Sequence, residues 1–412
     1  MPVSRQDRAV LRELGRQYAE IAALPDQQRT IALWKAHNGL KPVRPMVTID
    51  QVAWHEMNVN DELTLRATEP WCREIETHLR RTLYGWRHLR VDMVVEPAAD
   101  IRKAFSVTGF GIEVDEDVAV SDPKNDVVGH FYHDQLRTEA DLAKIRTPQV
   151  TFDAAANART EELAHEIFDG VLPVRMRGTG YPMFAPWDQL SMWRGVQNVL
   201  FDLADRPEFV HRIMARLLEA HLGLLDQLEA LGLLENWPRI HCTGAHTDEL
   251  PAAGADPARL RARDVWAFGQ AQMFSTVSPA MHDEFELAYA KQWYDRFGLI
   301  YYGCCEPLDQ KIAIIRRIPR VRKISMSPWV DIERGASQIG RDFVFSRKPN
   351  PAFLARDQWD PAGVEADLRA TRDACRRHGC PLEFILKDIS TVHYEPQRLW
   401  QWAEIAMRVA KE

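Results

Sequence analysis

Short apolar runs rich in β-branched residues recur along the chain, and segments with helical periodicity separate them. This alternation is typical of parallel strands joined by crossover helices. The runs that fit it are residues 45–49, 91–96, 172–176, 239–243, 299–304, 321–326, 342–346 and 382–388. Eight such units predict an α/β fold of the (βα)8 TIM-barrel type, with residues 1–412 as a single domain.

Helix start and stop signals stand between these runs. Proline opens and glycine closes an amphipathic stretch at 207–232, and the same signals delimit 278–298 and 360–379. A further helix at about 6–24 precedes the first strand, which predicts an N-terminal helical extension over residues 1–43.

One stretch breaks the alternation after the second predicted strand. Residues 104–135 contain period-two segments, split by Ser-Asp-Pro-Lys-Asn at 121–125. They predict a β-rich insertion over about 98–150. A Pro-, Ala- and Gly-rich stretch at 244–263 follows the fourth predicted strand. Loops after strands lie over the catalytic end of a barrel, so both stretches are expected near the site.

Composition excludes several classes of function. The 52 Lys and Arg residues are interleaved with 59 Asp and Glu residues, for a net charge of −7, which argues against nucleic-acid or membrane partners. No run of about eighteen apolar residues is present and the first residues are charged, so we expect no spanning helix, no signal peptide and a cytoplasmic location. Six cysteines are too few for a disulfide scaffold and are interpreted as reduced thiols.

Polar and aromatic residues gather where predicted strands end, and the carboxyl ends of barrel strands form the active site. Asp50, His55 and Glu96 follow the first two strands and are the predicted catalytic acids and bases. The predicted substrate-binding residues are Gln270, Gln272, Tyr181, Trp187, Tyr302 and His393. Tyr302 is included because the period of two places it on the same face as Cys304. The structural alternatives are solvated loop carboxylates and packed aromatic side chains.

The order of several segments carries a resemblance to a known superfamily. They are VRMRGTGYPMFAPWDQLSMWRG (174–195), the helix at 203–232, MFSTVSPAMHDEF (273–285) and KISMSPWVDIERGASQIG (323–340). From about residue 170 to the end, and less closely from residue 44, the chain resembles the uroporphyrinogen decarboxylase and cobalamin-linked methyltransferase superfamily. Residues 49–56 lack the arginines by which the decarboxylase branch binds substrate carboxylates, which argues against uroporphyrinogen decarboxylation.

The zinc methyltransferase branch ends its fifth strand with His-x-Cys and has another Cys after the eighth. Cys304 matches the first cysteine, Tyr302 replaces the histidine, and Asp388 replaces the second cysteine. With His241 at the end of the fourth predicted strand and Glu306 beside Cys304, the resemblance implies a Zn²⁺ site. Buried thiol and loop-bonded imidazole are the structural alternatives.

Two enzyme hypotheses follow. The first is metal-assisted methyl transfer between a small methylated substrate and a corrinoid on a partner protein. The second is a metal-free decarboxylase or lyase, with Asp50 or His55 as acid/base and Arg175 or Arg177 holding a carboxylate. A non-catalytic binding protein is a third alternative, and a homodimer is considered.

Overall fold

Seven parallel strands form the main sheet of the computed structural model, which describes residues 3–121, 123, 125 and 128–412. Their order is β1-β15-β14-β13-β12-β11-β8. The bounds are β1 Met46–Ile49, β8 Met183–Phe184, β11 Trp266–Gly269, β12 Leu299–Tyr302, β13 Val321–Met326, β14 Val344–Arg347 and β15 Leu382–Leu386. The predicted α/β fold with parallel strands is confirmed, and five of these strands overlap predicted runs.

Eight further strands of the described residues pair outside this sheet. They are β2 Ala99–Arg102, β3 Phe105–Val107, β4 Glu116–Ala119, β5 Gly129–Tyr132, β6 Val150–Phe152, β7 Val174–Arg177, β9 Arg239–Ile240 and β10 Thr243–Gly244. β2 and β7 pair in parallel, whereas β3–β6, β4–β5 and β9–β10 are antiparallel. Across the described residues the paired strands do not join into one closed ring, so the barrel stays a prediction.

The strand predicted at 91–96 is wrong, and the reason lies beside β1. Asp92 donates its backbone N–H to the carbonyl of Val47, and its carboxylate accepts the N–H of Val47 at 2.9 Å. The side chain thus takes the place of a ladder carbonyl. The strand itself starts later, at Ala99.

The parallel strand predicted at 239–243 is also wrong. His241 has φ of 49°, and it turns the chain back so that Thr243 pairs with Ile240 in a two-residue hairpin. On the side of β12 away from β13, the neighbouring strand is instead β11, which could not be predicted because its Trp-Ala-Phe-Gly sequence has no β-branched residue.

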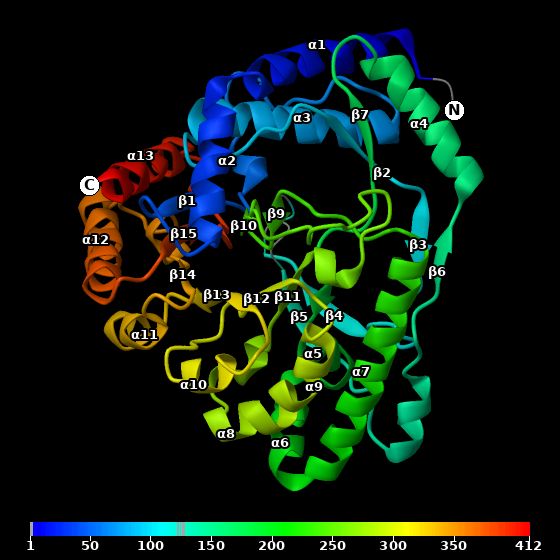
Figure 1. Ribbon diagram of the computed structural model, residues 1–412, viewed down its shortest axis with the longest axis vertical. Coiled ribbons are helices and arrows are strands. Elements are labelled where there is room, and N and C mark those ends of the chain that lie inside the picture. The colour runs from blue at the N-terminus through cyan, green and yellow to red at the C-terminus, as the bar shows by residue number, and fades with distance from the viewer. Residues whose placement is uncertain (1–2, 122, 124, 126–127) are drawn as a thin grey trace.

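Helices surround the sheet (Figure 1). Their bounds are α1 Arg5–Ala22, α2 Pro25–Asn38, α3 Pro70–His88, α4 Ala154–Phe168, α5 Pro186–Arg194, α6 Val196–Asp205, α7 Pro207–Ala230, α8 Pro279–His282, α9 Ala288–Tyr294, α10 Ile312–Ile315, α11 Ile332–Ile339, α12 Pro361–His378 and α13 Gln397–Lys411. The helices predicted at 207–232 and 360–379 are confirmed as α7 and α12. The helix predicted at 278–298 is α8 and α9, joined by a π-helical turn at Asp283–Leu287.

The N-terminal extension holds two helices, α1 and the unforeseen α2. Asn38 donates to the carbonyls of Gly244 and His246, and the Trp34 indole donates to the carbonyl of Asp92. Helix α2 therefore lies against β1 and the β9–β10 hairpin as part of the packed fold (Figure 1).

The predicted β-rich insertion contains the antiparallel pairs β3–β6 and β4–β5. Asp122 and Lys124 of its predicted break lie outside the described residues. Asn125 donates to the carbonyl of Ser390, which follows β15. The insertion thus contacts the carboxyl end of the sheet, where the site is expected.

The two faces of the sheet differ. Ile300, Tyr302, Ile324, Phe345 and Phe384 pack into the large apolar core that the helices cover. Tyr301 and Ile385 alternate with these residues and lie on the opposite face, where they and Cys304, which follows the end of β12, meet the β9–β10 hairpin. No helix of the described residues combines the length and apolar character needed to cross a membrane.

Candidate functional site

Polar side chains lie among apolar ones on the sheet face that meets the β9–β10 hairpin, which we call the inner face. Lys323 and Ser325 of β13, Ser346 of β14 with Lys348 after it, and Glu383 of β15 are all buried. Their spacing of two places each pair on one side. This alternation of polar residues within apolar runs is a signal that the sequence analysis did not use.

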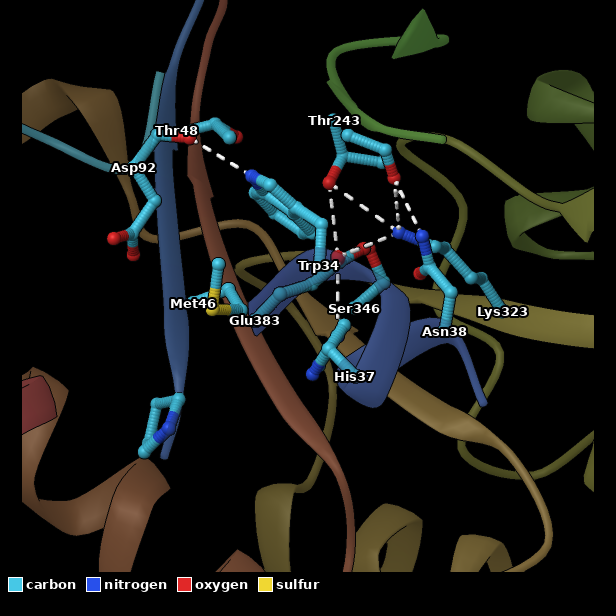
Figure 2. A network of polar contacts seen from close by, with 12 residues as sticks. Trp34, His37, Asn38, Met46, Thr48, Asp92, Thr243, Lys323, Ser346 and Glu383 are labelled. Carbon is cyan, nitrogen blue, oxygen red and sulfur yellow. Dashed lines mark hydrogen bonds and ion pairs between the residues drawn. The ribbon is translucent and has the colours of Figure 1, made fainter. Parts of the chain in front are cut away.

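Glu383 lies at the centre of a group of polar side chains on this inner face. Figure 2 shows Lys323, Thr243 and His37 directed toward its carboxylate. Lys323 Nζ lies 2.8 Å and Thr243 Oγ1 2.9 Å from Glu383 Oε2, and His37 Nε2 lies 3.3 Å from it. Although burial opposes ionisation, Lys323 and His37 lower the pKa of Glu383. The cluster is therefore an ion pair held by helix α2.

Hydrogen bonds connect this ion pair to the carboxyl end of the sheet. Ser346 donates to Glu383 at 2.7 Å, and its hydroxyl contacts Tyr301 Oη at 2.7 Å. Lys348 donates to Tyr301 at 2.9 Å and also to Ser325. Ser325 donates to the carbonyl of Cys304 at 2.5 Å. The network therefore ends at the predicted reaction centre.

Cys304 is surrounded by groups that stabilise a thiolate. Its Sγ lies 3.6 Å from His241 Nε2, 3.6 Å from Lys387 Nζ and 3.5 Å from the Sγ of Cys305. Asp388 Oδ2 lies 2.5 Å from Lys387 Nζ and 3.7 Å from the Cys305 sulfur. The structure thus brings together the predicted residues His241, Cys304 and Asp388.

Electrostatics favour ionisation of one thiol. The hydrogen bond from Cys305 lowers the pKa of Cys304 against the effect of burial, and His241, Lys348 and Lys387 lower it further. The pKa of Cys305 is raised by the same bond and by burial. Burial lowers the pKa of Lys387, but the charges of Cys304, Cys305 and Asp388 outweigh it and raise that pKa. The surroundings of Cys304 therefore favour a thiolate beside the Lys387 ammonium group.

The backbone around this centre is unusual. Gln51, His241 and Asp388 all have left-handed φ angles, of 47°, 49° and 57°. Non-glycine residues adopt this region rarely, and such strain gathers at functional sites. Asp388 donates its N–H to the Gln51 side chain at 3.2 Å, which joins two of these turns.

The three predicted catalytic residues line a row of adjoining cavities. Asp50 lines a cavity of about 420 Å³, His55 one of about 490 Å³ and Glu96 one of about 190 Å³. The Asp50 cavity shares Gln51 with the His55 cavity and Arg239 with the Glu96 cavity. Gln51 also accepts the N–H of Asp388, which connects this row to the neighbourhood of Cys304, although Cys304, His241 and Lys387 do not line any of the three cavities.

Several charged side chains that line the cavities are already in ion pairs with each other. Arg239 pairs with Asp50, and Glu96 Oε2 lies 2.5 Å from Arg175. Asp100 accepts hydrogen bonds from Arg175 at 2.6 Å and from Arg177 at 3.0 Å. The two arginines assigned to a substrate carboxylate in the lyase hypothesis are thus already neutralised by carboxylates of the chain.

Gln270 and Gln272 both donate to Asp188 Oδ2. Burial raises the pKa of Asp188, and these amides oppose the rise. Tyr181 packs edge-on against Phe268 with ring centres 6.0 Å apart, and burial raises its pKa to about 12. Tyr181 precedes β8, and the two glutamines follow β11, and the contact of these side chains with substrate stays a prediction.

Three predicted substrate contacts face elsewhere. Tyr302 donates to Glu286 Oε2 at 3.1 Å and contacts His282 in the helix layer. Gly303, with φ of 90°, ends the strand after Tyr302, so Cys304 no longer follows the alternation of the strand. The prediction that Tyr302 and Cys304 share a face is therefore wrong. Trp187 is fully buried against Phe274, and the ring of His393 contacts the carbonyl of Ala355.

The predicted zinc ligands do not fit a complete metal site. His241 and Cys304 face one another, but Asp388 is paired with Lys387 and Glu306 accepts two backbone N–H groups instead. Among the described residues, no group of three or more His, Cys, Asp and Glu is arranged to hold a metal ion. The Lys387 ammonium would also repel a cation at the Cys304 sulfur.

Comparison with known proteins adds little. No protein-family model matches the chain, and no curated protein does. Among solved structures, it is similar to a methyltransferase from Methanosarcina mazei, with 10% identity, coverage of 93% of this chain and 98% of that chain, and a TM-score of 0.49. A likeness this weak supports neither a fold nor a reaction.

Proposed function

We propose that the chain is a methyltransferase that acts on a small methylated substrate at the Cys304 thiolate. The single observation that supports this most is the contact of a buried Cys304 with His241 and Lys387. A thiolate is the nucleophilic form of cysteine, and basic neighbours are what activates it. The resemblance in segment order supports the same reaction class.

In the proposed reaction the Cys304 thiolate attacks the methyl carbon of the substrate. The bond from sulfur to carbon forms while the bond from the methyl group to its heteroatom breaks. The electron pair stays on the heteroatom, which takes a proton from the Lys387 ammonium. The methyl group then passes to an acceptor, and the electron pair of the sulfur–carbon bond returns to sulfur.

A corrinoid on a partner protein is the proposed acceptor, on the sequence resemblance alone. Zinc at His241 and Cys304 and a homodimer also stay predictions, and elemental analysis of the purified protein tests the first. The lyase alternative has lost its main support, because Arg175 and Arg177 are held by Glu96 and Asp100.

The test uses free cob(I)alamin as acceptor and a panel of methanol, methylamines, methyl thioethers and methoxylated aromatic compounds. We expect one donor class to consume cob(I)alamin, and Cys304→Ser to abolish this without unfolding the protein. A transient mass increase of one CH₂ unit on Cys304 would mark the thioether. Full activity in Cys304→Ser, or no reaction with any donor, contradicts the proposal.

A further inference from the structure

We propose that Glu306 is a positioning residue, which ties the ends of β11 and β12 together and thereby fixes Cys304 for reaction. Its Oε2 accepts the N–H of Cys304 at 3.0 Å, and its Oε1 accepts the N–H of Ala271 at 3.1 Å. Ala271 comes two residues after the end of β11, and Cys304 two residues after the end of β12. One side chain therefore clamps both strand ends.

The clamp stands where the strand ladder stops. Gly303 donates to the carbonyl of Gly269 at 2.7 Å, and this backbone bond is continuous with the β11–β12 pairing. Beyond it, the N–H groups of Ala271 and Cys304 both need acceptors. Two donors cannot pair with each other, whereas the two oxygens of one carboxylate accept both. Without Glu306, two buried N–H groups would lose their partners.

The location of the carboxylate argues for a role beyond packing. Glu306 is fully buried, and within the described part of the chain no Lys, Arg or His nitrogen lies within 4.0 Å of its oxygens. A buried carboxylate that no cation contacts directly is costly to the fold, and burial together with the charge of Cys304 raises the pKa of Glu306. A fixed geometry for the reacting thiol is a gain that accounts for this cost.

Both segments that the clamp joins carry site residues. On one side, Gln270 and Gln272 flank Ala271 and hold Asp188. On the other side, the Cys304 peptide is fixed from two directions, at its N–H by Glu306 and at its carbonyl by Ser325. The thiolate and the predicted substrate amides are thus held in register. Because both oxygens of Glu306 accept backbone N–H groups, this role replaces the predicted one as a metal ligand.

The first test measures how fast iodoacetamide alkylates Cys304, located by peptide mass spectrometry, and needs no substrate. Glu306→Gln keeps one acceptor oxygen but presents an amide donor to the other N–H. We expect alkylation of Cys304 to change by about 10-fold or more, the scale of a misplaced reacting group. Glu286→Gln is the matched control, because Glu286 is also fully buried but contacts Tyr302 in the helix layer. It should leave the rate unchanged.

Activity supplies the second readout, and only this part rests on the proposed function. We expect Glu306→Gln to lower kcat with little change in KM, since the substrate cavities are left intact. An unchanged Cys304 alkylation rate in folded Glu306→Gln, or an equal change in Glu286→Gln, overturns the clamp. Loss of the proposed function is distinct, because it shows as full activity in Cys304→Ser while the alkylation result stands.

A third measurement uses the unaltered protein, in case Glu306→Gln does not fold. Hydrogen exchange should show the amides of Ala271 and Cys304 as protected as the Gly303 amide of the adjoining ladder. Fast exchange of either amide would overturn the proposal. Glu306→Asp, which keeps the charge but is one methylene shorter, should be intermediate between the unaltered protein and Glu306→Gln in alkylation.

Discussion

Lys387 Nζ lies 3.6 Å from Cys304 Sγ, and both side chains are almost completely buried. Because the surrounding dielectric is low, the ammonium and the thiolate stabilise each other more than they would at the surface. The same lysine contacts Asp388 and Cys305, so it is the common neighbour of the carboxylate and the two sulfurs. A variant that removes the charge of Lys387 therefore tests this pairing.

Lys387→Met should raise the pKa of the Cys304 thiol by about 1 unit or more, because a cation within 4–6 Å stabilises the thiolate by that amount. Alkylation of Cys304 by iodoacetamide should then slow near neutral pH and recover in alkaline solution. The measurement is the pH profile of the alkylation rate. Lys411→Met, at the exposed end of α13, is the control. An unchanged profile in Lys387→Met would contradict the charge pairing.

Glu286 makes stability depend on pH. Burial raises its pKa from 4.5 to about 8, so between these values the folded chain keeps a proton that the unfolded chain has lost. The free energy of unfolding contributed by this group therefore falls as pH rises from about 4.5 to about 8. Glu286→Gln removes the effect. Denaturant unfolding should therefore show that this variant gains stability relative to the unaltered protein when the pH is raised from 5 to 8. Glu284→Gln, an exposed neighbour, should show no such gain.

Glu383→Gln should lower the free energy of unfolding by about 3–5 kcal/mol, because it leaves the Lys323 ammonium buried without a counter-charge. Both side chains are fully buried and 2.8 Å apart. Denaturant unfolding of Glu383→Gln, Lys323→Met and the double variant forms a mutant cycle. The double variant should recover part of the loss. Independent, additive effects would show that the pair is not coupled.

Gly244→Ala tests the packing of helix α2 on the hairpin. A Cβ at this position would lie 2.5 Å from Cδ2 of Trp34, whose indole is bonded to Asp92. The ring must shift, and we expect a loss of about 1–3 kcal/mol from such overpacking, measured by thermal or denaturant unfolding. Gly180→Ala is the matched control, since nothing lies within 4 Å of its added Cβ. Equal stability of the two variants would argue against tight packing of α2.

The sequence predicts the fold best where local pattern and long-range pairing agree. Helix α7 and strand β13 were predicted because their periodicity is strong and their ends carry capping or turn residues. The predictions fail where a side-chain hydrogen bond or a rare φ angle determines the path of the backbone. The Asp92 carboxylate replaces a strand carbonyl, and the left-handed His241 converts an expected strand into a hairpin.

The site shows the same division. Cys304 and Asp388 were selected through the resemblance in segment order and His241 through an expected strand end that is in fact a hairpin turn, yet the structure places all three around one sulfur and its neighbour. The role of Glu306 was not predictable, because a side chain that turns back onto its own backbone leaves no periodic signal. Lys348 and Lys387 were missed because lysine is rarely buried, although their spacing on the inner face was visible in the sequence.

Helix α2 belongs to the first part of the chain, yet its His37 contacts Glu383 of the last strand, β15. During synthesis on a ribosome, this histidine is made long before its carboxylate partner leaves the exit tunnel. The ion pair of Lys323 and Glu383 can therefore form only after residue 383 has been made. A chain that stopped before residue 383 would lack both Glu383 and Lys387, and would leave Lys323 without its counter-charge and Cys304 without its neighbouring ammonium group.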